Sequence, residues 1–381
     1  MVQLPTVSPK ILFLFSDTGG GHRSAAEAII EALHLNFGDA ISTEMVDIIK
    51  QYAPRPLNRL PDLYPSMVRL PRVWGFGYRL SDGRHRARLL NASSWPYVSK
   101  SIRALVANNP CDLIVSVHPL ATAPVIRALN NTSRPPLITV VTDLVSTHAF
   151  WYHPQTDLCL VPTENARQRA LHYGLKPEIV QVTGLPVANR FCQPASDKQH
   201  LRASYGWPAN RPLIMLVGGG EGMGPIEKTA HAIAQADLPI SLVVITGRNE
   251  SLKARLESYN WSIPTYIYGF VRSMPDFMQA ADILVTKAGP GTISEALNAG
   301  LPMVLYSRLP GQESGNIDYI TSEGAGIWAP QVTEIVAAIR HWIDHPLNLE
   351  QARLHCQRLA RPHAAHHIAQ ILVEKVGIPI S

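Results

Sequence analysis

The sequence lacks several features that would place it in a class at once. It has four cysteines in 381 residues, all widely separated, and no two of them form a Cys-x-x-Cys pair. This argues against a disulfide framework or a thiol zinc site and predicts reduced thiols. No apolar run is long enough to cross a bilayer, and the first ten residues lack the apolar core of a secretory signal. We therefore expect a cytoplasmic protein that at most associates peripherally with a membrane.

Signatures of metal-dependent and common nucleotide chemistry are also absent. No Asp-x-Asp sequence occurs, so a divalent metal held by such a carboxylate pair is not indicated, and we predict neither a metal nor a cofactor. No stretch matches GxxxxGK[ST], which excludes a P-loop. The first glycine-rich turn does not match GxGxxG, so a nicotinamide or flavin dinucleotide site is poorly supported.

The bulk composition is that of an ordinary soluble protein. Hydrophobic residues make up 46% and charged residues 17% of the chain, and the net charge is +5 with a pI near 9.0. This excess is too mild to indicate nucleic acid as a partner. The length exceeds one typical core, so two domains are expected. We found no sequence signal for an oligomeric state.

Short apolar runs, among them 213–217 and 265–268, alternate through most of the chain with helical stretches, among them 164–172 and 274–280. This alternation predicts an α/β fold with parallel sheets, in two Rossmann-like domains that face each other across a cleft. A polar, proline-bearing stretch separates the two halves and is interpreted as a linker. The predicted segments are an N-terminal Rossmann-like domain (1–188), a linker (189–211), a C-terminal Rossmann-like domain (212–345), and helices that pack back across the cleft (346–381).

Three glycine-rich turns follow predicted strands, at Ser16–Arg23, Gly218–Pro225 and Lys287–Thr292. A glycine turn between a strand and a helix presents unpaired backbone N–H groups at the positive end of the helix dipole, which binds phosphate without a metal. Glu295 lies about one turn into the helix after the third turn, where its carboxylate could reach ribose hydroxyls. The alternative is that these glycines serve packing only.

Four motifs in this order carry a family resemblance. SDTGGGHR at Ser16–Arg23, GGGEGMGPIE at Gly218–Glu227, KAGPGTISEA at Lys287–Ala296 and GQESGN at Gly311–Asn316 together resemble monogalactosyldiacylglycerol synthases of glycosyltransferase family 28. The resemblance extends from about Lys10 to Leu359. It implies the GT-B fold, inverting chemistry, a UDP-sugar donor bound by the C-terminal domain (212–345), and diacylglycerol as the acceptor of an N-terminal acceptor- and membrane-binding domain (1–188).

The resemblance also implies roles for individual residues. The donor diphosphate is expected on Gly219, Gly220, Gly222, Gly289, Pro290, Gly291 and Thr292, the ribose on Glu295, the uracil on Phe270 and Val271, the sugar on Gln312, Glu313 and Asn316, and the acceptor on the loop with Gly20 and Gly21. In one departure, Ala188 stands where the plant enzymes typically carry Arg. Any charge supplied by that Arg must come from elsewhere, with Arg190 and Lys287 as candidates.

An inverting transfer requires a base on the acceptor side. His22 and Asp143 lie on predicted loops of the first half, and an imidazole with a near-neutral pKa suits this task. We favour His22 as the base with Asp143 assisting, although His22 could merely order its loop and Asp143 could orient a histidine or cap a helix. His118 and His148 are second-rank candidates.

Positive charge gathers between Lys50 and Arg103, where eleven Lys and Arg residues face two Asp residues and aromatic side chains are interleaved. Such a mixture suits an anionic membrane surface, and no motif for reading nucleic acid is present. The alternative is a solvated insertion. The expected membrane contacts are Arg69, Arg72, Trp74, Arg84, Arg86 and Arg88.

The favoured function is transfer of galactose from UDP-galactose to 1,2-diacylglycerol. Three alternatives remain: a UDP-glucose-dependent diacylglycerol glucosyltransferase, a catalytically silent peripheral membrane protein, and a sugar-nucleotide epimerase. The intact His22, Glu295, Gln312 and Glu313 argue against the second alternative, and the basic insertion argues against the third.

Overall fold

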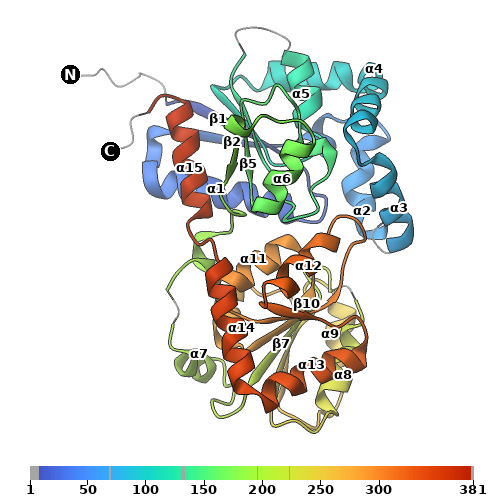
Figure 1. Ribbon diagram of the computed structural model, residues 1–381, viewed down its shortest axis with the longest axis vertical. Helices are drawn as coiled ribbons and strands as arrows, with labels where there is room; N and C mark the ends of the chain where they lie inside the picture. Colours follow the sequence, from blue (N-terminus) through green and yellow to red (C-terminus); the bar gives the residue numbers. More distant parts are fainter. Residues whose placement is uncertain (1–7, 68–69, 130–133, 195, 223, 379–381) are drawn as a thin grey trace, which may run out of the picture. The chain divides into compact units, whose positions relative to one another are not determined.

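The computed structural model describes residues 8–67, 70–129, 134–194, 196–222 and 224–378. The chain forms two compact units (Figure 1). Unit 1 comprises Met1–Asn189, Leu309–Gln312 and His363–Ser381, and unit 2 comprises Arg190–Arg308 and Glu313–Pro362. Each unit contains a parallel sheet that has six strands within the described residues, so the predicted α/β architecture is confirmed.

The sheet of unit 1 has the strand order β2-β1-β3-β4-β5-β6. Its strands are β1 (Lys10–Phe15), β2 (Ser42–Asp47), β3 (Leu113–Ser116), β4 (Leu137–Val140), β5 (Leu158–Val161) and β6 (Val180–Val182). Its helices are α1 (Gly21–Phe37), α2 (Leu60–Met67), α3 (Pro71–Ser81), α4 (Arg84–Asn108), α5 (Thr122–Leu129), α6 (Glu164–His172) and α15 (Ala364–Lys375).

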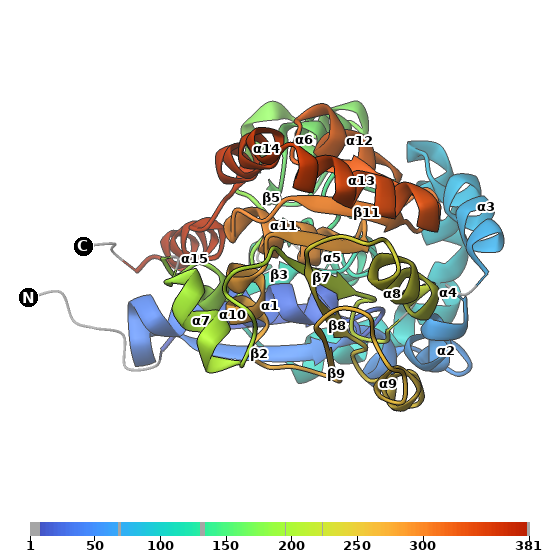
Figure 2. The same ribbon diagram turned by 90° about the horizontal axis from the view of Figure 1, so that it is seen from below.

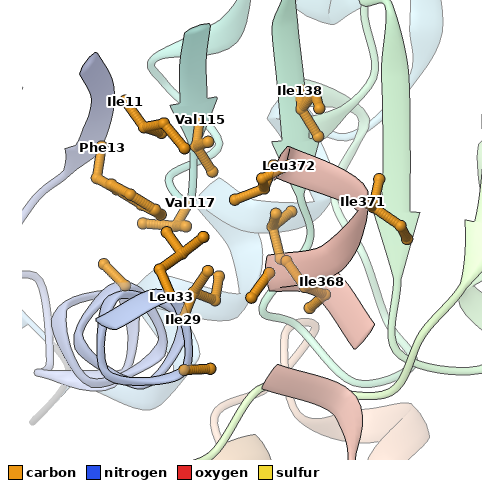
Figure 3. Packing of buried hydrophobic residues seen from close by; sticks show 14 of the residues in the cluster. Ile11, Phe13, Ile29, Leu33, Val115, Val117, Ile138, Ile368, Ile371 and Leu372 are labelled. Carbon is orange, nitrogen blue, oxygen red and sulfur yellow. The ribbon is translucent and has the colours of Figure 1, made fainter. Parts of the chain in front are cut away.

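Strand β1 is apolar at nearly every position, as expected of a central parallel strand that is covered on both faces. On one face, Ile11 and Phe13 pack with α1 and with the C-terminal helix α15. Figure 3 shows side chains of α15 beside those of α1 and of the sheet. On the other face, Leu12 and Leu14 pack against α4 and α5. The last helix in the sequence therefore completes the core of the first sheet.

The sheet of unit 2 has the order β12-β11-β10-β7-β8-β9. Its strands are β7 (Leu213–Val217), β8 (Ser241–Ile245), β9 (Thr265–Tyr268), β10 (Ile283–Lys287), β11 (Met303–Ser307) and β12 (Gly326–Trp328). Its helices are α7 (Lys198–Ser204), α8 (Ile226–Ala234), α9 (Glu250–Glu257), α10 (Met274–Ala280), α11 (Pro290–Asn298), α12 (Ser314–Ser322), α13 (Val332–Asp344) and α14 (Pro346–Leu359). Helices α8 and α13 lie side by side (Figure 2) and cover one face of the sheet.

The structure differs from the sequence-based organisation in three places. The segment predicted as a linker contains helix α7, which is fixed because Arg202 is buried and donates to the carbonyl of Ala280 and the carboxylate of Asp282. The C-terminal tail is divided, with α14 in unit 2 and α15 in unit 1. The short segment Leu309–Gln312 groups with unit 1, where Pro310 packs on Gly75.

Candidate functional site

In each unit the glycine-rich turns lie where the strand order reverses. Ligands of open α/β sheets bind at such a switch point, beyond the carboxyl ends of the strands. In unit 1 the switch falls between β1 and β3, which lead into the loops that carry Thr18 and His118. In unit 2 it falls between β7 and β10, which lead into the second and third glycine turns. The topology thus defines one candidate site in each unit.

In unit 1 the first glycine turn ends at the start of α1. Gly20 is the N-cap residue with φ of 78°, Gly21 is the first helical residue, and the first turn of the helix holds no acidic residue. Gly19, at φ of 88°, lies against the ring of Tyr64. Positive φ values favour glycine here, and the helix N-terminus is left without a side-chain cap.

His22 is the first inward-pointing residue of α1 and is buried. Its Nδ1 lies 2.8 Å from Oγ1 of Thr142, the residue before Asp143. The His22 ring also meets the ring of His118 edge-on, with 4.7 Å between centroids. His118 Nε2 lies 3.1 Å from Thr18 Oγ1, and its Nδ1 accepts from the backbone N–H of Leu120. His118 therefore carries its proton on Nε2.

Burial keeps both imidazoles neutral. Desolvation lowers the pKa of His22 to about 4, opposed in part by a backbone hydrogen bond to Val117. The pKa of His118 is lowered well below its ordinary value by burial and by the neighbouring His22. The near-neutral pKa expected for His22 is therefore not found, because the sequence does not reveal how deeply the ring is buried. At cellular pH the ring is unprotonated, as a general base must be.

Asp143 is held by two neutral donors. Its Oδ2 accepts from the indole N–H of Trp151 at 2.7 Å, and its Oδ1 accepts from the side-chain amide of Gln312 at 2.9 Å. Gln312 was predicted to contact the sugar, and here it orients Asp143 while its Oε1 is buried without a partner among the described residues. No motif indicated Trp151, which lies in a short 3₁₀ helix and is fully buried.

In unit 2 the turn after β7 needs its glycines. Gly222 has φ of 59°, and a Cβ there would lie 2.2 Å from the carbonyl oxygen of Thr246. Gly219 has φ of 72°, and the carbonyl of Gly220 accepts from the backbone N–H of Arg248 at 2.9 Å. The turn is thereby fixed against the end of β8.

The turn after β10 is shorter than predicted, because α11 already begins at Pro290. Gly289 is its N-cap residue without a side-chain cap, and the first turn has no acidic residue. Within the described part of the chain, no acceptor is found for the backbone N–H groups of Gly291 and Thr292. Pro290 has no N–H to offer, so these two donors form the open positive end of α11.

Glu295 lies one turn into α11 and is partly buried. Desolvation raises the pKa of this carboxyl to about 7, and the charge of Arg190 opposes the rise. A carboxylate that is this costly to ionise is a candidate for receiving hydrogen bonds from a ligand. The sequence indicated Glu295 by its position alone.

The predicted sugar contacts Glu313 and Asn316 are buried beside the same turn. Asn316 donates to the carbonyl of Ala288 at 2.9 Å, and its Oδ1 has no partner among the described residues. Glu313 Oε1 lies 3.0 Å from Nζ of Lys287. From the sequence, Lys287 is a candidate only for the charge that plant enzymes supply with an Arg at the position of Ala188. The other candidate, Arg190, has its charge near Glu295.

The predicted uracil contacts follow the edge strand β9. The ring of Phe270 is 58% exposed, and the guanidinium of Arg248 lies over it at 5.0 Å. Val271 comes next in the chain and is half-buried. An exposed aromatic ring at the carboxyl end of a strand is available to stack on a base.

The predicted membrane contacts lie on α3 and the start of α4, except Arg69, which falls outside the described residues. Arg72 is exposed, whereas Trp74 packs edge-on against Tyr64. A pocket of about 460 Å³ at the joint of the two helices is lined by Arg79, Asp82, Gly83, Arg84, His85, Arg86, His172 and Tyr173. Arg88 follows on α4 and is exposed.

Two of the aromatic residues of α3, Trp74 and Phe76, are among those interleaved with the basic residues in the sequence, whereas Val73 and Leu80 were not singled out. Val73, Phe76 and Leu80 recur at helical spacing and are 66%, 65% and 60% exposed. Helix α3 therefore presents an apolar stripe to solvent next to exposed arginines. None of the helices, as far as the chain is described, has the length and apolarity needed to span a membrane.

Side chains suited to metal binding do not cluster. Among the described residues, no group of three or more His, Cys, Asp or Glu is arranged to hold a metal ion. Metal independence stays a prediction.

Both units match known family models. Residues 22–187 match the monogalactosyldiacylglycerol (MGDG) synthase model, and residues 213–368 match the glycosyltransferase family 28 C-terminal domain. The chain is 38% identical over 372 residues to a probable monogalactosyldiacylglycerol synthase 2, chloroplastic, of Oryza sativa subsp. japonica, covering 94% of this chain and 79% of the relative. It is 36% identical to monogalactosyldiacylglycerol synthase 1, chloroplastic, of Arabidopsis thaliana, covering 97% and 72%.

Solved structures share the fold at low identity. MurG of Acinetobacter baumannii aligns with a TM-score of 0.62 and 15% identity, over 96% of this chain and all of that chain. Staphylococcus aureus MnaA, solved with UDP, aligns with a TM-score of 0.64 and 15% identity, over 97% and 98%. These similarities identify the fold as GT-B. The 38% identity to the Oryza sativa relative over most of both chains, with family matches in both units, establishes that this chain belongs to the monogalactosyldiacylglycerol synthase family of glycosyltransferases.

Proposed function

We propose that the chain transfers galactose from UDP-galactose to the free hydroxyl of 1,2-diacylglycerol with inversion, giving β-monogalactosyldiacylglycerol and UDP. The observation that carries this proposal is the 38% identity, along nearly the whole chain, to a relative whose name states this product. The glycine turns at the switch point of unit 2 support it, because they offer backbone donors to a diphosphate.

The proposed reaction is a single displacement. The acceptor hydroxyl oxygen attacks the anomeric carbon, the bond between that carbon and the β-phosphate oxygen breaks, and UDP leaves with the electron pair. His22 takes the hydroxyl proton, since its neutral ring has one nitrogen able to accept. Asp143 assists from its fixed position between Trp151 and Gln312.

The departing UDP gains negative charge, and unit 2 offers donors for it without a metal. The free N–H groups of Gly291 and Thr292 lie at the positive end of α11. Prearranged dipoles of this kind stabilise a developing charge without reorganising. In the same proposal Glu295 accepts from the ribose hydroxyls, and Glu313 and Asn316 contact the hexose.

Diacylglycerol stays in a bilayer, so the proposal includes peripheral membrane association through α3 and the start of α4. The exposed stripe of Val73, Phe76 and Leu80 would enter the interface. Arg84 and Arg86 flank it and would attract anionic headgroups.

The test is an assay of the purified chain on diacylglycerol vesicles with labelled UDP-galactose or UDP-glucose, with and without EDTA, followed by identification of the lipid product. We expect galactolipid in both the presence and the absence of EDTA. Glucolipid as the main product would instead support the glucosyltransferase alternative. UDP binding without any product would support a silent membrane protein.

The His22→Asn variant tests the role of His22 as general base, and His118→Asn, at the neighbouring histidine, is its control. Loss of a general base costs about 10²- to 10⁴-fold in rate. We expect a loss of this size in kcat for H22N with UDP affinity unchanged, and a smaller loss for H118N. A larger effect of H118N would transfer the role to His118.

A further inference from the structure

Lys287 lies where the two glycine turns of unit 2 meet. It is the last residue of β10, and the pairing of β10 with β11 is irregular between Thr286 and Lys287, so that Lys287 pairs with Ser307. Such a β-bulge redirects the side chain that follows it. Here the redirected side chain runs over the glycine turns.

Two distances define the position of the Lys287 side chain. Cε of Lys287 lies 3.4 Å from the position that a Cβ of Gly219 would occupy, and Nζ lies 3.4 Å from the same position at Gly289. The side chain is thus in contact with the turn after β7 through Cε, and its ammonium group lies beside the turn after β10. The open end of α11, with the free N–H groups of Gly291 and Thr292, follows directly.

The ammonium is also held in place. Nζ forms an ion pair with Oε1 of Glu313 at 3.0 Å, and the side chains of Lys287 and Glu313 are 23% and 4% exposed. A lysine ammonium has three N–H donors. Because Glu313 occupies one of them, the lysine can keep this partner and still donate to a ligand on the turns.

The other cations near the turns are less suitable. Arg248 approaches Gly220, but its side chain is 62% exposed and is paired with Glu221. Arg190 exerts its charge on Glu295, further along α11. Of these three cations in the described part of unit 2, Lys287 has the side chain that contacts both turns, and it is partly sheltered from solvent.

We propose that Lys287 is the cation that binds the diphosphate of the donor, and that Glu313, in addition to its proposed contact with the hexose, positions this ammonium group through Oε1. This inference rests on the proposed function and deepens it, since it assigns the charge that Ala188 does not provide. The charge on the leaving UDP grows as the bond to the anomeric carbon breaks, so the lysine contributes to the rate as well as to binding.

The experiment compares the affinities of UDP and uridine, measured by calorimetry at one salt concentration, for the wild type, Lys287→Met and Arg248→Met. Uridine lacks phosphate, so it reports the integrity of the base and ribose contacts. For K287M we expect at least about a tenfold loss of UDP affinity with uridine affinity unchanged, as for a charge-assisted hydrogen bond. For R248M we expect less than about a threefold change in the ratio of the two affinities.

Kinetics give the second readout. In the galactosyl transfer assay, kcat of K287M should fall by at least as much as its UDP affinity, and Lys287→Arg should restore part of it. Equal losses of UDP and uridine affinity in K287M, or an unchanged UDP affinity, would overturn the assignment. A wild type that does not bind UDP would instead refute the proposed function itself.

Discussion

Among single residues, Glu295 has the most testable titration. Its pKa is raised to about 7 by desolvation, whereas hydrogen bonds from ribose hydroxyls require the carboxylate as acceptor. Ribose binding should therefore weaken as pH falls through 7. We expect UDP-galactose to bind about tenfold more weakly at pH 6 than at pH 8. Calorimetry with UDP-galactose suits this test, because its phosphates do not titrate in this range.

The control is Glu295→Gln, which cannot ionise. Its affinity for UDP-galactose should be low at both pH values and nearly independent of pH. An equal pH dependence in the wild type and in E295Q would show that another group titrates.

Ionisation of Glu295 favours ligand binding but lowers the stability of the fold. Because the folded state raises this pKa, the ionised carboxylate is disfavoured in the fold, and the free energy of unfolding decreases as pH rises from about 4.5 towards 7. Above pH 7 the penalty is fully present. We expect E295Q to raise the free energy of unfolding at pH 8 by about 3 kcal/mol, and to change it little at pH 4. Urea denaturation at the two pH values measures this, and destabilisation at pH 8 would contradict it.

The sequence identified most motif residues but not their environments. Glu295, Glu313 and Asn316 were found because they occupy fixed places in recognisable motifs. Other features depend on neighbours that are distant in sequence. These are the low pKa of His22, the hydrogen bond from the amide of Gln312 to Asp143, and the position of the Lys287 side chain. A motif does not specify such contacts.

Among the elements, α3 carries the clearest surface prediction. Replacing Val73, Phe76 and Leu80 with Ser removes its exposed apolar stripe without disturbing a buried contact. We expect binding to anionic vesicles to fall at least about tenfold, because burial of each such side chain stabilises by 1.5 to 3 kcal/mol when complete. Vesicle co-sedimentation measures the loss, and UDP affinity should stay unchanged.

A matched control is available in unit 2. Leu347 and Leu354 are 82% and 46% exposed on α14, and their replacement by Ser should leave vesicle binding unchanged. If both sets of variants weakened binding equally, the membrane contact would not be specific to α3.

The bounds of helices and strands are predicted best where the chain is apolar. The strands β7 and β9 and the helices α6 and α10 match their predicted bounds, because their apolar runs or helical periods are short and clearly bounded. Strand β2 was missed because only its last two residues are buried. Helices α2, α3 and α4 were missed as elements, since prolines and arginines interrupt the expected apolar pattern.

At the scale of the whole molecule, α15 links the end of the sequence to the beginning. Ile368 and Leu372 are fully buried against β1, β3 and α1. We expect Ile368→Ala or Leu372→Ala to destabilise unit 1 by about 2 to 5 kcal/mol, as for other buried large-to-small changes. Hydrogen exchange of peptides from β1 and β3 should then become faster.

Peptides from β7 and β8 of unit 2 are the internal reference for this experiment. Their exchange should be nearly unchanged, because α15 contributes to the core of unit 1. Faster exchange in unit 2 alone would contradict the assignment of α15.

The two-domain α/β organisation could be predicted from the alternation of strands and helices, and the family from four ordered motifs. The return of α15 to the first sheet and the grouping of Leu309–Gln312 with unit 1 could not. Both depend on contacts between residues hundreds of positions apart, and local periodicity carries no information on them.

The position of α15 has a consequence for biosynthesis. Proteins emerge from the ribosome starting at the N-terminus, and the first domain usually folds first. Here the first sheet stays uncovered along part of one face until the last helix has been made. The second half, whose strands and covering helices all lie between residues 190 and 362, has its whole core available earlier. The order of folding during translation would thus be reversed relative to the order of synthesis.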